Sequence, residues 1–253
     1  MKIILPIFTL IAVFAITAYV INFHNSGISN DTSHWGTFGD YIGGVLGTVF
    51  SFTSVLLIYL TFKKQQETSV LQQFESTFFS LLAVQREMMK SVTGKVITRN
   101  GLKKTYSGAN FFEVLFEELY VDFLFLECTT IEEERAKMCK LYGERFYEAG
   151  PLLGPYYRHL YHFLKYTETS DIGKKKKKYM DIVQSQMSDA ELYCLFYNAI
   201  CYGSEKLLPI LDNYSFLENI EPKSKSFDNH KRWFYPNTAF KYHHHEYRPD
   251  ELQ

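Results

Sequence analysis

Residues 35–64, WGTFGDYIGGVLGTVFSFTSVLLIYLTFKK, decide the architecture of this chain. Residues 41–62 are largely apolar, and no charged side chain lies between Asp40 and Lys63. At 1.5 Å per residue, a helix of about 22 residues spans a bilayer core of roughly 30 Å. A buried core helix is the alternative, but such helices are usually shorter and amphipathic. The stretch therefore predicts a transmembrane helix over residues 41–62.

A second apolar segment, residues 3–23, reads IILPIFTLIAVFAITAYVINF. A cleaved signal peptide is the alternative, but the apolar core is long for one and no small-x-small cleavage site follows it. Pro6 falls in the first helical turn, where a missing N–H is tolerated. We therefore expect an uncleaved transmembrane helix and a two-helix transmembrane hairpin over residues 1–62.

The charges around the two spans predict their orientation. Residues 24–40 contain no Lys or Arg, whereas Lys2, Lys63 and Lys64 flank the spans on the other side. By the positive-inside rule, the short loop lies outside and both termini are cytoplasmic, as in a multi-pass membrane protein. The predicted membrane-interface residues are Trp35, Tyr41, Lys63 and Lys64.

The second span carries small residues at every fourth position: Gly39, Gly43, Gly47 and Ser51. Residues four apart share one face of a helix, and small side chains let a second helix approach closely. The partner is either the first span of the same chain or a second copy. We predict these residues as a helix-packing or oligomerisation site, and a homo-oligomer as the assembly. Neither span carries an ionisable side chain, which argues against a proton relay.

The rest of the chain predicts an all-α fold: a cytoplasmic helical domain over residues 63–220. An amphipathic helix continues after Lys64, with Gln85 in one otherwise apolar slot. Residues 94–108 indicate a loop or a short hairpin. Thr130 is placed to start a helix, and Ser188-x-x-Glu191 has the spacing of a capping box. Residues 221–253 are proline-containing and aromatic, and predict an irregular C-terminal tail.

Composition excludes several classes of function. The net charge of −1 gives no overall nucleic-acid footprint. The four cysteines are Cys128, Cys139, Cys194 and Cys201. They form no CxxC pair and no zinc-ligand spacing, so we expect buried, reduced thiols, as in a cytoplasmic domain.

Three further clusters have simple interpretations. The five lysines at 174–178 predict a solvated loop, or else a segment attracted to anionic lipid. His243, His244 and His245 cannot all face one metal on a regular helix or strand. Arg158, His159 and His162 have no carboxylate or cysteine nearby in sequence. With no GxSxG, HExxH or P-loop motif, we predict no catalytic, cofactor-binding or metal-binding residues and no enzyme activity.

Four segments, in this order, resemble the AbiC-like family of phage abortive infection proteins: WGTFGDYIGGVLGTVFSFTSVLLIYLTF, FESTFFSLL, YYRHLYHFLKYTE and QSQMSDAELYCLFYNA. The resemblance covers residues 35–220. Their order and spacing are more specific than any one segment. The chain departs from the family at Gly47-Thr48-Val49, where the family often has a proline.

The resemblance implies an anti-phage defence effector of the bacterial inner membrane. Similar two-span proteins act in multi-component systems, including retrons, in which a reverse transcriptase and its RNA–DNA product restrain the effector. The expected partners are thus the lipid bilayer, further copies of the chain, and a reverse transcriptase with its RNA–DNA product or another defence component. The family supplies no catalytic motif to carry over.

Two alternatives remain open at the level of sequence. One is a nucleic-acid sensor or RNase that is merely tethered to the membrane. HEPN-type RNases are helical and use an R-x4–6-H pair, a spacing that Arg158-His159 lacks. The other is a membrane scaffold that recruits a separate toxin. A truncated chain without residues 1–62 that still cleaves RNA or kills cells would favour the first alternative.

Overall fold

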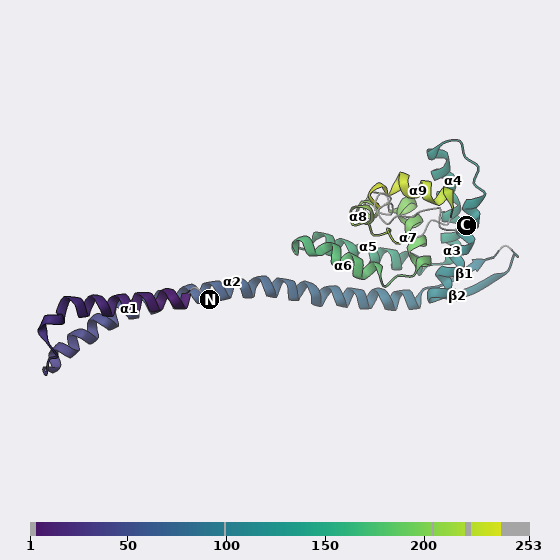
Figure 1. Ribbon diagram of the computed structural model, residues 1–253. Helices are drawn as coiled ribbons and strands as arrows, with labels where there is room; N and C mark the ends of the chain where they lie inside the picture. Colours follow the sequence, from purple (N-terminus) through teal and green to yellow (C-terminus); the bar gives the residue numbers. More distant parts are fainter. Residues whose placement is uncertain (1–3, 99, 204, 221–223, 239–253) are drawn as a thin grey trace, which may run out of the picture. The chain divides into compact units, whose positions relative to one another are not determined.

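The computed structural model describes residues 4–98, 100–203, 205–220 and 224–238. Contacts divide the chain into two compact units, Met1–Gln72 and Gln73–Gln253. Figure 1 shows a mostly helical protein with one β-hairpin. The division between the units falls inside the longest helix, α2 (Thr32–Ser91), so each unit contains part of it.

The first unit holds α1 (Ile4–Phe23), the short η1 (His24–Ser26) and the first part of α2. Gly27 adopts a positive φ of 63° as the chain leaves η1. Asp31 then accepts a hydrogen bond from the backbone N–H of Ser33 at 2.9 Å, which caps the start of α2. The helix therefore begins at Thr32, nine residues before the expected span, because this cap makes the polar residues before Tyr41 helical.

Each of the two helices buries one face. On α1, Ile11, Ala12 and Tyr19 are half-buried and Ala15 is only 3% exposed. On α2, the half-buried residues are Phe38, Ile42, Val45, Leu46, Val49, Thr53 and Leu57. Both sets recur at intervals of about three and four residues, the spacing of one helix face. Ring contacts of Tyr19 with Phe38 and Tyr41 show that α1 and α2 meet at one end of the pair.

One described helix, α2, is long and apolar enough to cross a membrane, and no residue of its apolar window is buried. The described apolar part of α1, Thr9–Phe23, is shorter. Large apolar side chains on both helices are open to the surroundings, including Phe14 at 74% and Phe52 at 72% exposure. Helices thus form where the two spans were expected, and among the described residues α2 alone has the length and composition of a membrane span.

The second unit corrects the expected all-α class, because residues 93–107 form a β-hairpin. Strand β1 (Thr93–Ile97) pairs antiparallel with β2 (Lys103–Ser107). Val96 is buried, and Gly94 lies so close to α4 that an added Cβ would be 2.2 Å from the Ala149 carbonyl oxygen. The hairpin interpretation of residues 94–108 is therefore right, and the fold is mostly rather than entirely α.

The remaining helices are α3 (Gly108–Leu124), α4 (Ile131–Ala149), α5 (Leu153–Thr169), α6 (Lys176–Gln184), α7 (Asp189–Tyr202), α8 (Leu207–Asn213) and α9 (Lys225–Phe234), with η2 (Gly173–Lys175) before α6. The predicted capping box is present: Ser188 accepts from the Glu191 N–H and the Glu191 side chain accepts from the Ser188 N–H. Thr130 caps α4 as predicted.

Helix α7 is the centre of the second unit, since residues 190–200 are all buried. The Tyr197 ring lies 4.4 Å from that of Phe123 on α3. Asn198, which we expected to need a partner if buried, donates to the Tyr142 hydroxyl of α4 at 3.0 Å.

Two further expectations change. The five lysines do not form a loop, because they lie in η2 and the first turn of α6. Part of the expected irregular tail is helix α9, whose Phe227 and His230 are buried. Its amphipathic pattern spans only ten residues, which hid it among the prolines and aromatics. His243, His244 and His245 lie outside the described residues.

The structure differs from the expectation of four reduced cysteines at one pair. Cys139 of α4 and Cys201 of α7 form a disulfide, with Cα atoms 5.1 Å apart. Cys128 and Cys194 are free. The bonded residues are 62 positions apart, so only the packing of α4 on α7 brings them together.

Candidate functional site: the open face of helix α2

The predicted small-residue stripe lies on an open face of α2. Gly39, Gly43, Gly47 and Ser51 are all exposed. A Cβ added at any of the three glycines would meet no atom of the described chain within 4 Å. The centre of the stripe is also turned away from the half-buried face of α2, because Val49 lies about 160° around the helix from Gly47. Within this chain, α1 therefore leaves the stripe uncovered.

The hydroxyl groups beside the stripe do not all need a partner from outside. Thr48 donates to the Gly44 carbonyl oxygen at 2.7 Å, within its own helix. Such bonds satisfy the hydroxyl while leaving the helix surface apolar. Gly44 and Thr48 are also small residues four positions apart. They lie about 100° further around α2 than Gly43 and Gly47.

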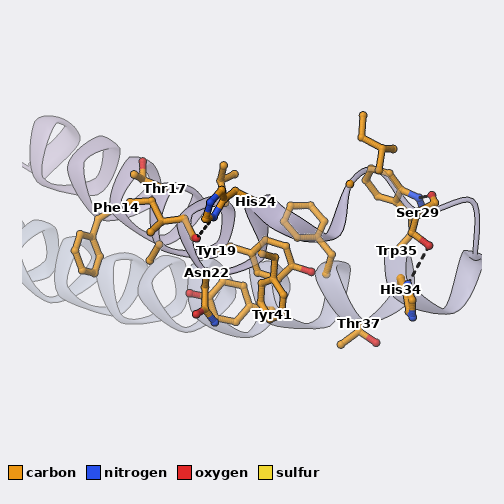
Figure 2. A pocket seen from close by; sticks show the side chains of 17 residues that line it. Phe14, Thr17, Tyr19, Asn22, His24, Ser29, His34, Trp35, Thr37 and Tyr41 are labelled. Carbon is orange, nitrogen blue, oxygen red and sulfur yellow. Dashed lines mark hydrogen bonds between the residues drawn. The ribbon is translucent and has the colours of Figure 1, made fainter.

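An aromatic cluster around Tyr19 lies at the end of the helix pair where the turn joins α1 to α2. The Tyr19 ring centroid lies 4.7 Å from that of Phe38 and 5.4 Å from that of Tyr41 (Figure 2). Trp35 is 56% exposed and its indole N–H donates to the Ser29 carbonyl oxygen at 2.9 Å. The structure thus brings the two predicted interface aromatics, Trp35 and Tyr41, to the same end of the pair.

The same end forms a concave surface, which Figure 2 shows from close by. Its imidazoles are engaged locally: a ring nitrogen of His24 lies 2.8 Å from the Ile21 carbonyl oxygen, and one of His34 lies 2.9 Å from the Ser29 hydroxyl. The polar groups therefore fix the turn between the helices, and six of the seventeen lining residues are Phe, Tyr or Trp.

Lys63 and Lys64, the predicted cytoplasmic boundary, are both exposed on α2. The helix continues without a break beyond them to Ser91. The lysine pair thus ends the apolar stretch but not the helix.

The last part of α2 belongs to the core of the second unit. Phe74 stacks on Tyr166 of α5, with ring centroids 5.5 Å apart and planes inclined by 6°. Phe78 is fully buried and lies 5.0 Å from Phe163 of α5. Tyr179 of α6 donates a hydrogen bond to Glu75. Helices α5 and α6 therefore hold this part of α2 through aromatic contacts.

A polar contact joins α2 and α5 about two turns beyond Phe78. Gln85, which fills the predicted apolar slot, is 6% exposed and its carbonyl oxygen lies 2.6 Å from Nδ1 of His159. Burial lowers the pKa of His159 from its ordinary value, which favours the neutral ring with a proton on Nδ1. The partner of this histidine is 74 residues away, so it could not be identified from neighbouring residues in the sequence.

A buried polar chain fastens α9 to α4 and α7. His230 lies 2.7 Å from Glu134 through Nε2 and 3.0 Å from the Tyr197 hydroxyl through Nδ1. Ser226 donates to the same Glu134 carboxylate at 3.1 Å. His230 has no exposed surface, so we assign this cluster to holding the helices together. Sequence reasoning missed it because its members are dispersed over three helices.

Among the described residues, no group of three or more His, Cys, Asp or Glu side chains could hold a metal ion. His162 of α5 contacts its neighbour Tyr161, with ring centroids 5.1 Å apart. Arg135 donates to the Ile200 carbonyl oxygen at 3.2 Å. The small-residue stripe on the open face of α2 therefore remains the candidate functional site.

Comparison with known proteins supports the family suggested by the sequence. Residues 148–225 match the family model "Putative phage abortive infection protein" (putAbiC). The match runs from the end of α4 through α8 and includes the α5 and α6 segments that hold α2. It confirms the AbiC-like resemblance over this part of the chain. Neither the curated proteins nor the solved structures contain a significant match.

Proposed function

We propose that this chain is a membrane effector of bacterial anti-phage defence, which acts by compromising the inner membrane once infection is sensed. The match of residues 148–225 to a phage abortive infection family supports the defence role. The apolar surface of α1 and α2 supports the membrane as its site of action.

In this proposal, both helices of the pair cross the bilayer, and both termini and the second unit are cytoplasmic. The support is the absence of Lys and Arg from residues 24–40, together with Lys63 and Lys64 after the second span. Trp35 and Tyr41 then lie at the outer interface, where amphipathic aromatic rings are typical.

The open face of α2 is the assembly surface in this proposal. Packing between membrane helices depends on close van der Waals contact, which small residues permit. Gly39, Gly43 and Gly47 have empty space beside them and are not covered by α1. A second copy of α2 is the partner that fits this face, and the self-associated form is the one that breaches the membrane.

The continuity of α2 supplies the connection between sensing and assembly. The helix that carries the glycine stripe also carries Phe74, Phe78 and Gln85, which pack in the second unit against α5 and α6. A change in that packing acts directly on α2. The effector needs no catalytic site in this mechanism, since the membrane itself is the target.

The trigger reaches the second unit through another component of the defence system. A reverse transcriptase with its RNA–DNA product is the class that the family resemblance implies. In that arrangement, the partner restrains the second unit, and loss of the partner after infection releases it.

Substitution of the stripe tests this proposal. The double variant Gly43→Leu/Gly47→Leu adds bulk to the assembly face, and the empty space beside both glycines lets the variant fold. We expect it to insert normally but to lose phage protection. The matched control is Gly44→Leu/Thr48→Leu, which adds leucines at the same spacing on the adjacent face and should retain protection. Protection that survives in the stripe variant at normal protein levels would contradict assembly through this face.

A further inference from the structure

The Cys139–Cys201 disulfide joins two half-buried residues of α4 and α7. Cys139 is in the middle of α4, and Cys201 is one residue from the end of α7. Both cysteines are only half-buried. The neighbouring Lys140 and Tyr202 are exposed, so the bond lies at the border of the core rather than within it.

The location of this bond conflicts with a permanent structural role. The proposed topology places the second unit in the cytoplasm, where glutathione and thioredoxin keep thiols reduced. Disulfides found in that compartment are usually transient, catalytic or redox-sensing. We propose that Cys139 and Cys201 form a reversible thiol–disulfide site, open in the resting cell and closed by hydrogen peroxide. This inference rests on the topology given under the proposed function.

The chemistry of the site balances with peroxide as the oxidant. One cysteine thiolate attacks an oxygen of hydrogen peroxide, the O–O bond breaks, and hydroxide leaves to give a sulfenic acid. The second cysteine attacks the sulfenic sulfur, the S–S bond forms, and the oxygen leaves as water. Two thiols and one peroxide thus yield one disulfide and two waters. Two molecules of a small thiol such as glutathione reopen the bond and are oxidised to their own disulfide.

Helices α4 and α7 remain in register when the bond is open, because other contacts join them. Arg135 donates to the Ile200 carbonyl oxygen at 3.2 Å, directly beside Cys201. Asn198 donates to the Tyr142 hydroxyl at 3.0 Å, and Phe146 lies 5.3 Å from Tyr202. These contacts preserve the geometry for closure, so the open and closed forms share one fold and differ in how firmly α4 and α7 are joined.

Closure affects the elements that hold α2. The loop between Cys139 and Cys201 contains α5 and α6, and a crosslink across it restricts the open forms of this segment. Phe163 and Tyr179, which contact α2, lie inside that loop. Oxidation should therefore stabilise the packing of α5 and α6 against the last part of α2.

The other two cysteines provide internal controls. Cys194 is fully buried, and burial raises the pKa of its thiol well above the ordinary range. Burial also raises the pKa of Cys128. A raised pKa lowers the thiolate fraction, so neither residue should respond to peroxide as the pair does.

Thiol trapping of the full chain in its own membranes tests the site. Cells are quenched in acid, and the denatured protein is labelled with a maleimide polymer that shifts its gel mobility. We expect four adducts from untreated cells, two after a brief hydrogen peroxide pulse, and four again after dithiothreitol. The Cys128→Ser control should move from three adducts to one, whereas Cys139→Ser should keep three throughout.

Two results would overturn the inference. Two adducts in untreated cells would mean a permanently closed disulfide and an oxidising compartment. Four adducts after peroxide would mean that the pair does not close. Neither result depends on phage protection or membrane potential, so failure of this site is distinguishable from failure of the membrane mechanism.

Discussion

The two units of this protein place the same kinds of side chain in opposite surroundings. In the first unit, Phe14, Phe52 and Ile58 are 74%, 72% and 69% exposed. In the second unit, Phe112 and Phe163 have no exposed surface. Soluble proteins rarely expose large contiguous apolar patches. The comparison indicates that the second unit makes its own apolar core. The first unit leaves its apolar side chains exposed, and in the proposed function lipid or other copies of the chain cover them.

The largest expected effect comes from removing a ring in the core of the second unit. Phe163→Ala deletes a fully buried side chain that packs on Phe78. We expect a loss of about 3–5 kcal/mol of unfolding free energy, from lost transfer energy and the cavity left behind. Phe52→Ala in the first unit leaves no such cavity. Thermal unfolding of both variants in nanodiscs, followed by circular dichroism, makes the comparison; equal melting temperatures would show that the second unit does not depend on this core.

Charge substitution at exposed phenylalanines sharpens the contrast between the units. Phe52→Arg places a cation in the proposed span and should cost about 2.5–3.5 kcal/mol on insertion. Phe125→Arg, at 78% exposure in the second unit, should have little effect because that site faces water. The measurement is the membrane-bound fraction after carbonate extraction. Full membrane retention of Phe52→Arg, with normal insertion, would argue against a lipid-facing position.

Loss of a helix cap should have a smaller effect, and it distinguishes global unfolding of the second unit from local fraying in the first. Ser188→Ala removes the cap of α7, whose first turns are buried, and should cost about 1 kcal/mol of the stability of the second unit. Asp31→Ala removes the cap of α2 in the first unit and should only fray that turn. Hydrogen exchange distinguishes the two outcomes: global loss of protection from Ser188→Ala and local loss from Asp31→Ala. A purely local effect at Ser188 would contradict the central place of α7.

The smallest expected effect is a pH dependence carried by His230 of the second unit. Burial lowers the pKa of His230 below its ordinary value of 6.5, although its bond to Glu134 opposes this shift. The unfolded chain therefore binds a proton more readily than the folded one, so stability is complete above pH 6.5 and declines as the pH falls through that value. The melting temperature of the wild type should thus fall more between pH 7 and pH 5 than that of His230→Gln. An identical fall in both proteins would remove His230 as the cause.

Local patterns in the sequence predicted much of the fold. The caps at Thr130 and Ser188 could be predicted because each capping hydrogen bond joins residues three positions apart. The helix continuing from Lys64 and the turn at residues 94–108 were also local features. The common face of Gly39, Gly43 and Gly47 follows from helix geometry alone.

Contacts between distant segments could not be predicted in this way. The Cys139–Cys201 bond and the His230–Glu134 contact each depend on the packing of separate helices. The early start of α2 depends on the Asp31 cap. Asp31 lies in a polar segment before a strongly apolar stretch, and the apolar stretch alone was used to predict where the helix begins. The contact of Gln85 with His159 shows the same limit, because a polar residue in an apolar slot indicates a partner without identifying it.

The central claim is that this protein acts on the membrane, and the membrane potential of infected cells tests it most directly. Cells carrying the intact defence system are compared with cells that lack only this protein, using a potential-sensitive dye during a synchronous infection. The account predicts depolarisation before phage release when the protein is present, and a maintained potential until lysis when it is absent. Protection with an undisturbed membrane potential would contradict the account.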